Sequence, residues 1–208
     1  MGIIAGKNFA FLALIVVSSV IMMNIVHARR NERSIAIRRI AGLDSLEEIV
    51  GRSTETGRPI HFTTGIAGIE GGDTTARVLG GLDLMSWMAK RVAHYNTQLV
   101  VTVCKPSTYA VTREIVKSSY EQAGQSEAFN ENMVRFLSDD QFAYASTAAN
   151  IMQSEQVAGN IMVGSFGGES ILLAETGSSL GAIQVAGDTN INQIPFFVVT
   201  CDYTLQIG

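Results

Sequence analysis

Residues 160–175 read NIMVGSFGGESILLAE and contain the pattern that decides the fold. The apolar run from Asn160 to Phe166 is typical of a buried strand. Gly167 and Gly168 then open a predicted helix that runs from Glu169 to about Ala186. A buried strand that leads through a glycine turn into a helix favours an α/β fold.

The same alternation of short apolar runs and longer helical patterns extends in both directions along the chain. Helices are predicted from Asp73-Thr74-Thr75 to about Tyr95, from Tyr109 to Gln122, and as a pair within Ser126–Ala158 that is broken near Ser138-Asp139-Asp140. Parallel strands need such crossover connections. We therefore expect a mostly parallel, Rossmann-like sheet with helices on both faces and about four strands: Pro59–Thr63, Gln98–Cys104, Asn160–Phe166 and Ile194–Asp202.

A glycine inside a helix costs about 1 kcal/mol relative to alanine, and three of the glycines inside predicted helices are singled out for a packing role. They are Gly80, Gly81 and Gly181. We expect them to allow the helices to pack closely against the sheet. His61 lies within a predicted strand and is expected to be structural.

The N-terminal region contains one long apolar segment. Phe9 to Val26 carries no charge and would span about 27 Å as a helix, which matches the hydrocarbon core of a bilayer. A cleaved signal peptide is the alternative, since Val26-His27-Ala28 has small residues where a peptidase requires them. The apolar run is longer than the usual signal core, so we expect a retained single-pass anchor.

Arginines follow the apolar segment closely, at positions 29, 30, 33, 38 and 39, whereas Lys7 is the only basic side chain before it. This asymmetry predicts that the segment is anchored in the cell membrane with the rest of the chain on the cytoplasmic side. The arginines either contact anionic lipid headgroups or serve as a topology signal only. We expect an anchor over residues 1–28, a basic juxtamembrane and helical connector over 29–57, and a soluble α/β domain over 58–208. The helical spacing within Ser34–Arg52 is expected to break once, at Gly42-Leu43-Asp44-Ser45.

The charge and cysteine content exclude several classes of protein. Residues 41–208 carry 9 Lys and Arg against 18 Asp and Glu, a net charge of −9, which repels a nucleic acid backbone. Cys104 and Cys201 lie in apolar runs, as inert core thiols do. The three histidines are scattered, so neither a disulfide framework nor a metal site is expected, and no cofactor is implied.

The anchor, the stretch GRSTETGRPIHFTTG at Gly51 to Gly65, and the run at Asn160 to Glu175 resemble an uncharacterised family of prokaryotic membrane-anchored proteins with a domain of unknown function. The resemblance covers most of the chain and implies no activity or catalytic residue. Similar proteins continue past the last predicted strand into further helix and membrane segments. The resemblance therefore raises the expectation that the chain continues past Gly208, or that a partner covers that strand.

In an open parallel sheet, ligands bind beyond the carboxyl ends of the strands. Glycine turns that open helices expose N–H groups to an anion, and a lysine can add charge. Neither glycine loop fits GxGxxG, so tight turns without a ligand are the alternative. The residues that would form such an anion site are Gly65, Gly68, Gly71, Gly72, Thr74, Lys105, Ser107, Ser165, Gly167 and Gly168.

The sequence favours two functions. The first is a membrane-anchored structural or assembly protein, a homo-oligomer or a subunit of a larger membrane complex, suggested by the low charge content and by an apolar last strand that lacks a covering helix. The second is a regulatory or sensory module that binds a small anion at the carboxyl edge. An enzyme is less favoured, because VGSFGG around Ser165 lacks the Gly-x-Ser-x-Gly spacing and no histidine offers a base.

Overall fold

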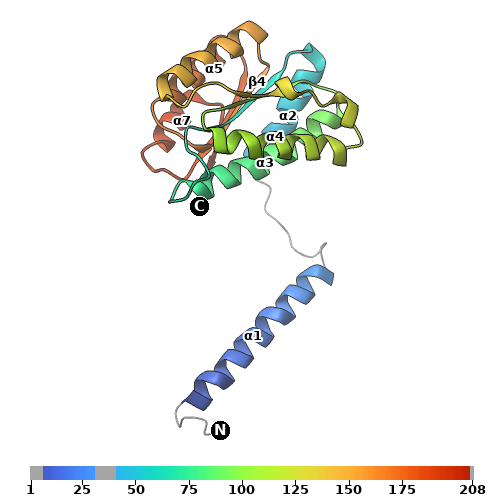
Figure 1. Ribbon diagram of the computed structural model, residues 1–208, viewed down its shortest axis with the longest axis vertical. Coiled ribbons are helices and arrows are strands. Elements are labelled where there is room, and N and C mark those ends of the chain that lie inside the picture. The colour runs from blue at the N-terminus through green and yellow to red at the C-terminus, as the bar shows by residue number, and fades with distance from the viewer. Residues whose placement is uncertain (1–6, 31–40, 207–208) are drawn as a thin grey trace. The chain divides into compact units, whose positions relative to one another are not determined.

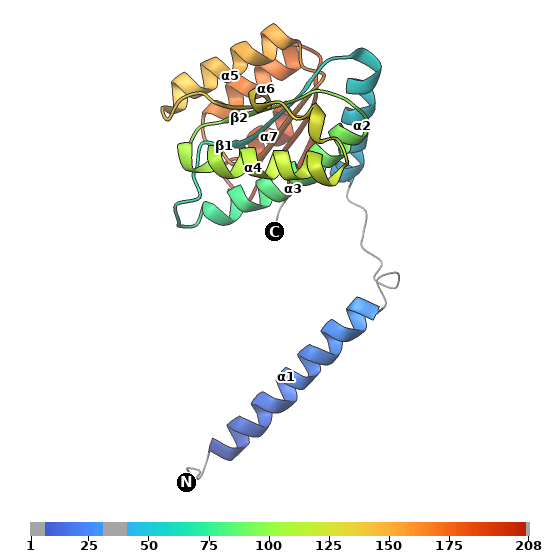
Figure 2. The same ribbon diagram turned by 45° about the vertical axis from the view of Figure 1, so that its right-hand side comes forward.

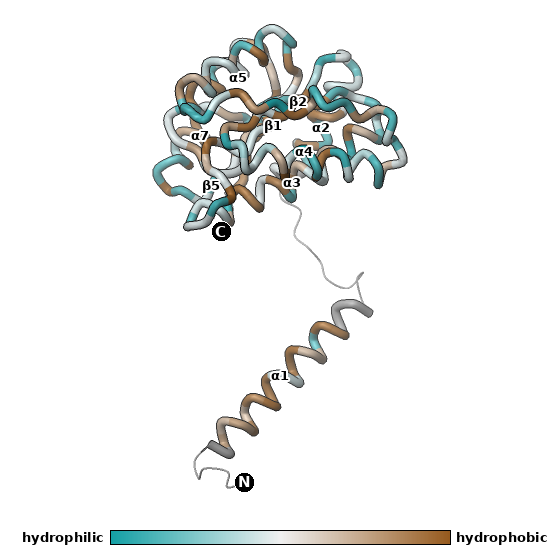
Figure 3. Tube along the Cα trace, in the orientation of Figure 1, coloured by the Kyte–Doolittle hydropathy of each residue, from teal (hydrophilic) through white to brown (hydrophobic). Residues whose placement is uncertain are grey.

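The computed structural model describes residues 7–30 and 41–206, and the chain divides into two compact units, 1–39 and 40–208. The first unit contains helix α1, Lys7–Arg30. Its segment Phe9–Val26 is, within the described residues, the one helix long and apolar enough to cross a membrane. Figure 3 shows hydrophobic colours along most of it.

The second unit is built on a six-stranded sheet in the part of the chain that the structure describes, and every pair of neighbouring strands is parallel. The strand order is β3-β2-β1-β4-β5-β6, the order of the doubly wound dinucleotide-binding fold. The α/β prediction with a parallel sheet is thus confirmed, with six strands in place of about four. The strands are β1 Ile60–Gly65, β2 Leu99–Val103, β3 Val134–Phe136, β4 Gly159–Ser165, β5 Ile183–Asp188 and β6 Tyr203–Gln206.

Helices cover both faces of the sheet, and Figures 1 and 2 show α5 on the opposite side from α3 and α4. One apolar core lies between the sheet and α2, α3 and α4, and a second lies between the sheet and α5, α6 and α7. β1 and β4, at the centre, are buried along their whole length, as expected for a sheet covered on both faces. The helices are α2 Ala41–Thr56, α3 Thr75–His94, α4 Pro106–Gln122, α5 Gln141–Glu155, α6 Glu169–Ser179 and α7 Ile194–Thr200, with two short 3-10 turns at Ser126–Ala128 and Glu131–Met133.

The prediction of a strand at Ile194–Asp202 is wrong, because Ile194–Thr200 forms helix α7. Pro195 occupies its first turn, where a missing N–H costs nothing. Phe197 packs inward, with its ring 5.6 Å from that of Phe166 in an edge-on arrangement. An apolar run of this length fits a strand and a helix equally well, and α7 provides the crossover that parallel β5 and β6 require. The uncovered apolar last strand that the sequence suggested therefore does not exist.

The predicted helix from Glu169 to Ala186 is also corrected. Helix α6 ends at Ser179, and Gly181 with φ of +62° turns the chain into strand β5. Only a residue without a side chain adopts this left-handed conformation at little cost. Gly181 therefore ends the helix and does not pack it against the sheet.

The segment Ser126–Ala158 contains one α-helix where two were predicted. Its first part forms the two 3-10 turns and the three-residue edge strand β3. The predicted break near Ser138–Asp140 is confirmed, because Asp140 caps α5 by accepting from the N–H groups of Phe142 and Ala143 at 3.0 and 2.9 Å. A strand this short leaves no periodic signal in the sequence.

Helix α2, assigned from the sequence to the connector, packs against the sheet with Leu46, Ile49 and Val50 buried. It runs without interruption through Gly42–Ser45, so the predicted break is absent in its described residues. The Ser45 hydroxyl donates to the Gly42 carbonyl within the helix, at 2.7 Å. The earlier part of the predicted connector, residues 31–40, lies outside the described residues.

Candidate functional site at the carboxyl edge of the sheet

The direction in which the chain adds successive strands to the sheet reverses between β1 and β4. The chain continues from β1 to β2 on one side and from β4 to β5 on the other. In open parallel sheets, ligands bind outside the carboxyl ends of the strands at such a point. Gly65 at the end of β1 is in register with Ser165 at the end of β4, so the two glycine loops are neighbours, as the sequence predicts.

Gly65 and Gly164 are required by the close approach of these two strands. Gly65 has φ of +85°, and an added Cβ would lie 2.7 Å from the Ser165 carbonyl carbon. A Cβ on Gly164 would lie 2.7 Å from the Thr64 carbonyl carbon. The N–H of Ile66 donates to the Ser165 carbonyl at 3.0 Å. Backbone proximity therefore explains these two glycines without a ligand.

Gly167 and Gly168 lie at the start of α6, and a carboxylate of the chain itself occupies this position. Glu169 is 1% exposed and folds back onto the turn. One carboxylate oxygen accepts from the Gly167 N–H at 2.8 Å, and the other accepts from the Gln141 amide at 2.6 Å. The N–H of Gly167, which the sequence suggested for an anion, is thus already paired with one.

A second buried carboxylate, Asp188 at the end of β5, binds the same loop. It accepts from the N–H groups of Phe166 and Asn190 at 3.1 and 3.0 Å. The Arg77 guanidinium lies 3.5 Å away and compensates its charge. Gln193 adds a bond from its amide to the Gly167 carbonyl, at 3.1 Å. These contacts fix the loop after β4 from the side of β5.

The loop after β1 is joined to the start of α4. The Ser107 hydroxyl donates to the Glu70 carboxylate, and this bond holds the pKa of Glu70 below its usual value. The Glu70 carboxylate also lies over Gly68, where a Cβ would overlap it. Gly71 and Gly72 have φ of +113° and +96° in the exposed part of the loop. Ser107 and Gly68 are therefore brought together through a carboxylate.

The remaining two predicted residues are Lys105, whose charge is already paired, and Thr74, whose side chain does not cap α3 in the described part of the chain. Lys105 forms an ion pair with Asp139 from the loop after β3, and this contact raises the pKa of Lys105. Thr74 precedes α3, and among the described residues its side chain makes no capping hydrogen bond. Burial raises the pKa of the Cys104 thiol to about 11, which makes it a poor nucleophile at neutral pH.

A row of hydrogen-bonded polar side chains crosses the sheet below this edge. His61 on β1 forms a hydrogen bond at each ring nitrogen. Nδ1 lies 2.8 Å from Asn160 Oδ1, and Nε2 lies 2.8 Å from Thr102 Oγ1. Asn160 on β4 donates to Gln184 Oε1 on β5 at 3.0 Å. The hydroxyl of Tyr144 on α5 bonds Thr102 Oγ1 at 3.0 Å. Burial lowers the pKa of His61 from 6.5 to about 4, so the ring is neutral at physiological pH.

Residue spacing did not predict that Glu169, Asp188, Gln141 and Gln193 form a connected set. Their contacts depend on side chains that fold back onto loops, which residue spacing does not encode. A carboxylate directly after a Gly-Gly turn at a helix start is the one usable sign, because helix N-termini attract negative charge.

The comparisons with known proteins identify the family and nothing beyond it. No curated protein and no solved structure matches the chain. The profile of one family, a domain of unknown function named DUF6754, matches residues 3–208, which include α1 and the whole described part of the α/β unit. The chain therefore belongs to the DUF6754 family.

Proposed function

We propose that this protein is a membrane-anchored assembly module, in which α1 crosses the cell membrane once and the cytoplasmic α/β unit associates with a second copy through α7. One observation carries this proposal, an exposed apolar surface formed by α7 and its neighbours. We name it the α7 surface. It consists of Ile171 and Leu172 on α6, Ile191 in the preceding loop, and Phe196, Val198 and Val199 on α7.

Contacts on the inner side of α7 hold it against the rest of the α/β unit. Phe197 is buried against Phe166, and the Gln193 amide binds the Gly167 carbonyl. On its outer side, Val199 is 85% exposed and Ile191 is 80% exposed. The elements that carry most of these side chains, α6 and α7, contact each other, and exposed apolar patches on a soluble surface commonly mark interaction sites.

The distribution of charge leaves the stretch around α7 as the place where a second copy can make contact. Residues 41–208 have a net charge of −9, so two copies repel each other over most of their surfaces. Residues 189–201, which include α7, carry no charged side chain. A two-fold contact through this stretch brings together uncharged apolar surfaces and keeps the acidic ones apart. The anchor also confines copies to two dimensions, which raises their effective concentration.

The anion-binding alternative has less support. Glu169 and Asp188 already accept from the N–H groups of Gly167 and Phe166, and Asp139 pairs with Lys105. A phosphate at this edge would have to displace carboxylates of the chain. We therefore favour assembly over ligand sensing.

Association through the α7 surface predicts that a charge on it separates the copies. Full-length protein in mild detergent at low concentration is expected to be a dimer or larger, and Val199→Asp is expected to shift it to monomer. Because the Val199 side chain is 85% exposed, the fold should tolerate the change. Sedimentation or light scattering measures the mass.

Phe142→Asp is the matched control, because Phe142 is a 76% exposed apolar side chain on α5, outside the α7 surface. It should leave the mass unchanged. A monodisperse wild-type monomer without a co-purifying subunit contradicts the proposal. So does an equal effect of both substitutions.

The orientation proposal rests on the arginines at positions 29, 30, 33, 38 and 39. We expect a cysteine placed at the exposed position Gln125 to be protected from a membrane-impermeant maleimide in intact cells, and to react after permeabilisation. Cys104 and Cys201 are replaced by alanine in the labelled protein. Labelling of intact cells would reverse the assigned topology.

A further inference from the structure

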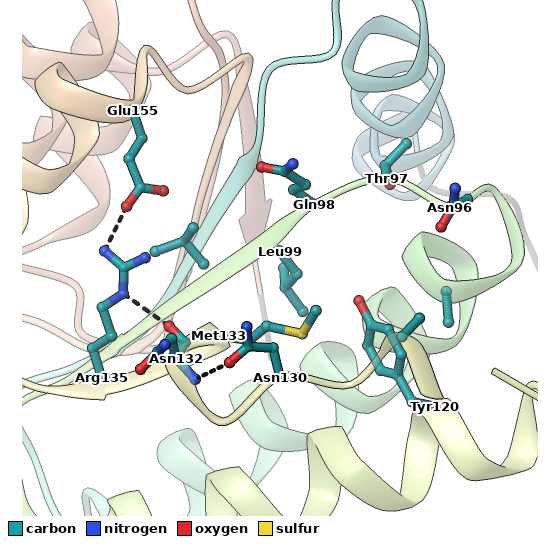
Figure 4. Close-up of a pocket in the computed structure, with 13 residues that line it drawn as sticks. Asn96, Thr97, Gln98, Leu99, Tyr120, Asn130, Asn132, Met133, Arg135 and Glu155 are labelled. Carbon is teal, nitrogen blue, oxygen red and sulfur yellow. Dashed lines mark hydrogen bonds and ion pairs between the residues drawn. The ribbon is translucent and has the colours of Figure 1, made fainter. Parts of the chain in front are cut away.

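A cavity of about 450 Å³ lies at the amino ends of β2 and β3, at the opposite edge of the sheet from the glycine loops. Its volume falls within the range of small-molecule sites. In Figure 4, Asn96, Thr97 and Gln98 lie along one side, while Arg135 with Glu155 and Tyr120 lie at opposite ends. Asn130, Asn132 and Met133 complete the labelled lining, with Leu99 between the two sides.

Tyr120 supplies an observation that points to a ligand. It projects from α4, is 1% exposed, and packs edge-on against Phe129 with 6.2 Å between ring centroids. Within residues 7–30 and 41–206, its hydroxyl has no hydrogen-bond partner. A buried hydroxyl left unpaired destabilises a protein by about 1–3 kcal/mol. Burial raises the pKa of Tyr120 to about 12, so the group keeps its proton at neutral pH and can both donate and accept.

The other buried tyrosine shows what a paired hydroxyl looks like in this fold. The Tyr144 hydroxyl bonds Thr102 Oγ1 at 3.0 Å and also the hydroxyl of Thr63. The fold therefore pairs one buried tyrosine within the sheet and leaves the other beside a cavity.

The charges in the lining compensate each other. Arg135 Nη1 lies 2.5 Å from the Glu155 carboxylate, and its Nε donates to the Asn132 carbonyl at 2.9 Å. The other polar side chains are carboxamides and one threonine, all uncharged. An anion would meet Glu155 and a cation would meet Arg135, whereas hydroxyl groups match carboxamides in both donating and accepting.

We propose that this cavity binds an uncharged polyhydroxylated molecule of monosaccharide size, with one of its hydroxyls paired to Tyr120. The carboxamides of Asn96, Gln98, Asn130 and Asn132 would recognise the remaining hydroxyls. Met133 and Leu99 would contact its C–H faces. This site is separate from the α7 surface, so it stands or fails independently of the assembly proposal.

Saturation-transfer difference NMR on the detergent-solubilised full-length protein tests the site, with glucose and N-acetylglucosamine as probes at millimolar concentration. We expect transfer to at least one sugar in the wild type and none in Asn132→Trp, in which an indole at an exposed lining position fills the cavity. Tyr120→Phe should weaken binding about tenfold, through loss of one hydrogen bond. Absence of transfer in the wild type, or equal transfer in Asn132→Trp, overturns the proposal.

The two tyrosines provide a second readout without ligand. Tyr120→Phe removes an unpaired hydroxyl and should leave the urea midpoint equal or higher, which also shows that the variant folds. Tyr144→Phe leaves Thr102 and Thr63 short of a partner and should lower the midpoint. If Tyr120→Phe lowers the midpoint as much as Tyr144→Phe, the Tyr120 hydroxyl has a partner within the protein and the proposal fails.

Discussion

Replacement of Gly81 by alanine is expected to lower the free energy of unfolding by about 3 kcal/mol, near the upper end for overpacking of a core. Gly81 lies on α3 where the helix crosses the sheet, and an added Cβ would lie 3.1 Å from the Val163 carbonyl carbon and would overlap the carbonyl oxygen. It would also lie 3.1 Å from the Thr64 methyl group. The obstacle is backbone of the central strand β4, which cannot rotate away, so α3 itself must move outward.

The neighbouring glycine is the matched control. Gly80 lies on the same helix, and among the described residues no atom outside its chain neighbours and the adjacent helix backbone comes within 4 Å of a Cβ built there. Gly80→Ala should therefore stabilise the helix by up to about 1 kcal/mol. Urea unfolding followed by the fluorescence of Trp87, the single tryptophan, measures both variants. Equal effects of the two substitutions would show that α3 does not depend on contact with the backbone of β4.

Acidification is expected to weaken the fold through His61. Its pKa is about 4 in the folded protein and 6.5 in the unfolded chain, so between these values the unfolded chain takes up a proton that the folded protein does not. The contribution of His61 is fully present above pH 6.5 and decreases as the pH falls to 4, by about 3 kcal/mol in total. Protonation of Nε2 would also remove the acceptor that faces the Thr102 hydroxyl.

The pH dependence of urea unfolding, compared between variants, isolates this contribution from that of the carboxylates. His61→Gln should flatten the dependence between pH 6.5 and 4, even if the variant is less stable at neutral pH. His94→Gln, at an exposed helix end, is the control substitution of the same kind. A wild-type slope in His61→Gln would mean that His61 is charged in the folded state.

Elements that are long or bounded by turn residues were predictable from the sequence. Short elements, and elements that follow one another without a clear turn signal, were not. β1, β2 and β4 are apolar runs that turn residues bound, and α3 and α4 have helical spacing over many residues. α7 was mistaken for a strand because its first six residues, 194–199, are all apolar, including those on the outer side that form the α7 surface. β5 continues the apolar pattern of α6, and only the left-handed Gly181 separates them.

The position of the candidate site at the carboxyl edge of the sheet was predictable, but the side-chain contacts within it were not. Parallel crossovers bring Gly65 and Ser165 to one edge, and this follows from the order of elements. That Glu169 turns back onto Gly167 depends on a side-chain rotamer and on Gln141, 28 residues earlier. The pairing of His61 with Asn160 and Gln184 depends on strand register, which the sequence did not specify because these strands are buried on both faces.

The central position of the β1–β4 pair has a consequence for synthesis on the ribosome. His61 and Asn160 are direct neighbours in the sheet but 99 residues apart in the chain. At about 5–20 residues per second, β1 waits roughly 5–20 s for the strand that completes its pairing. During this interval β1, β2 and β3 can assemble, but one side of β1 remains an open edge. The apolar segment of α1 emerges before any of them, so under the membrane anchoring proposed above the chain would complete its sheet at the membrane.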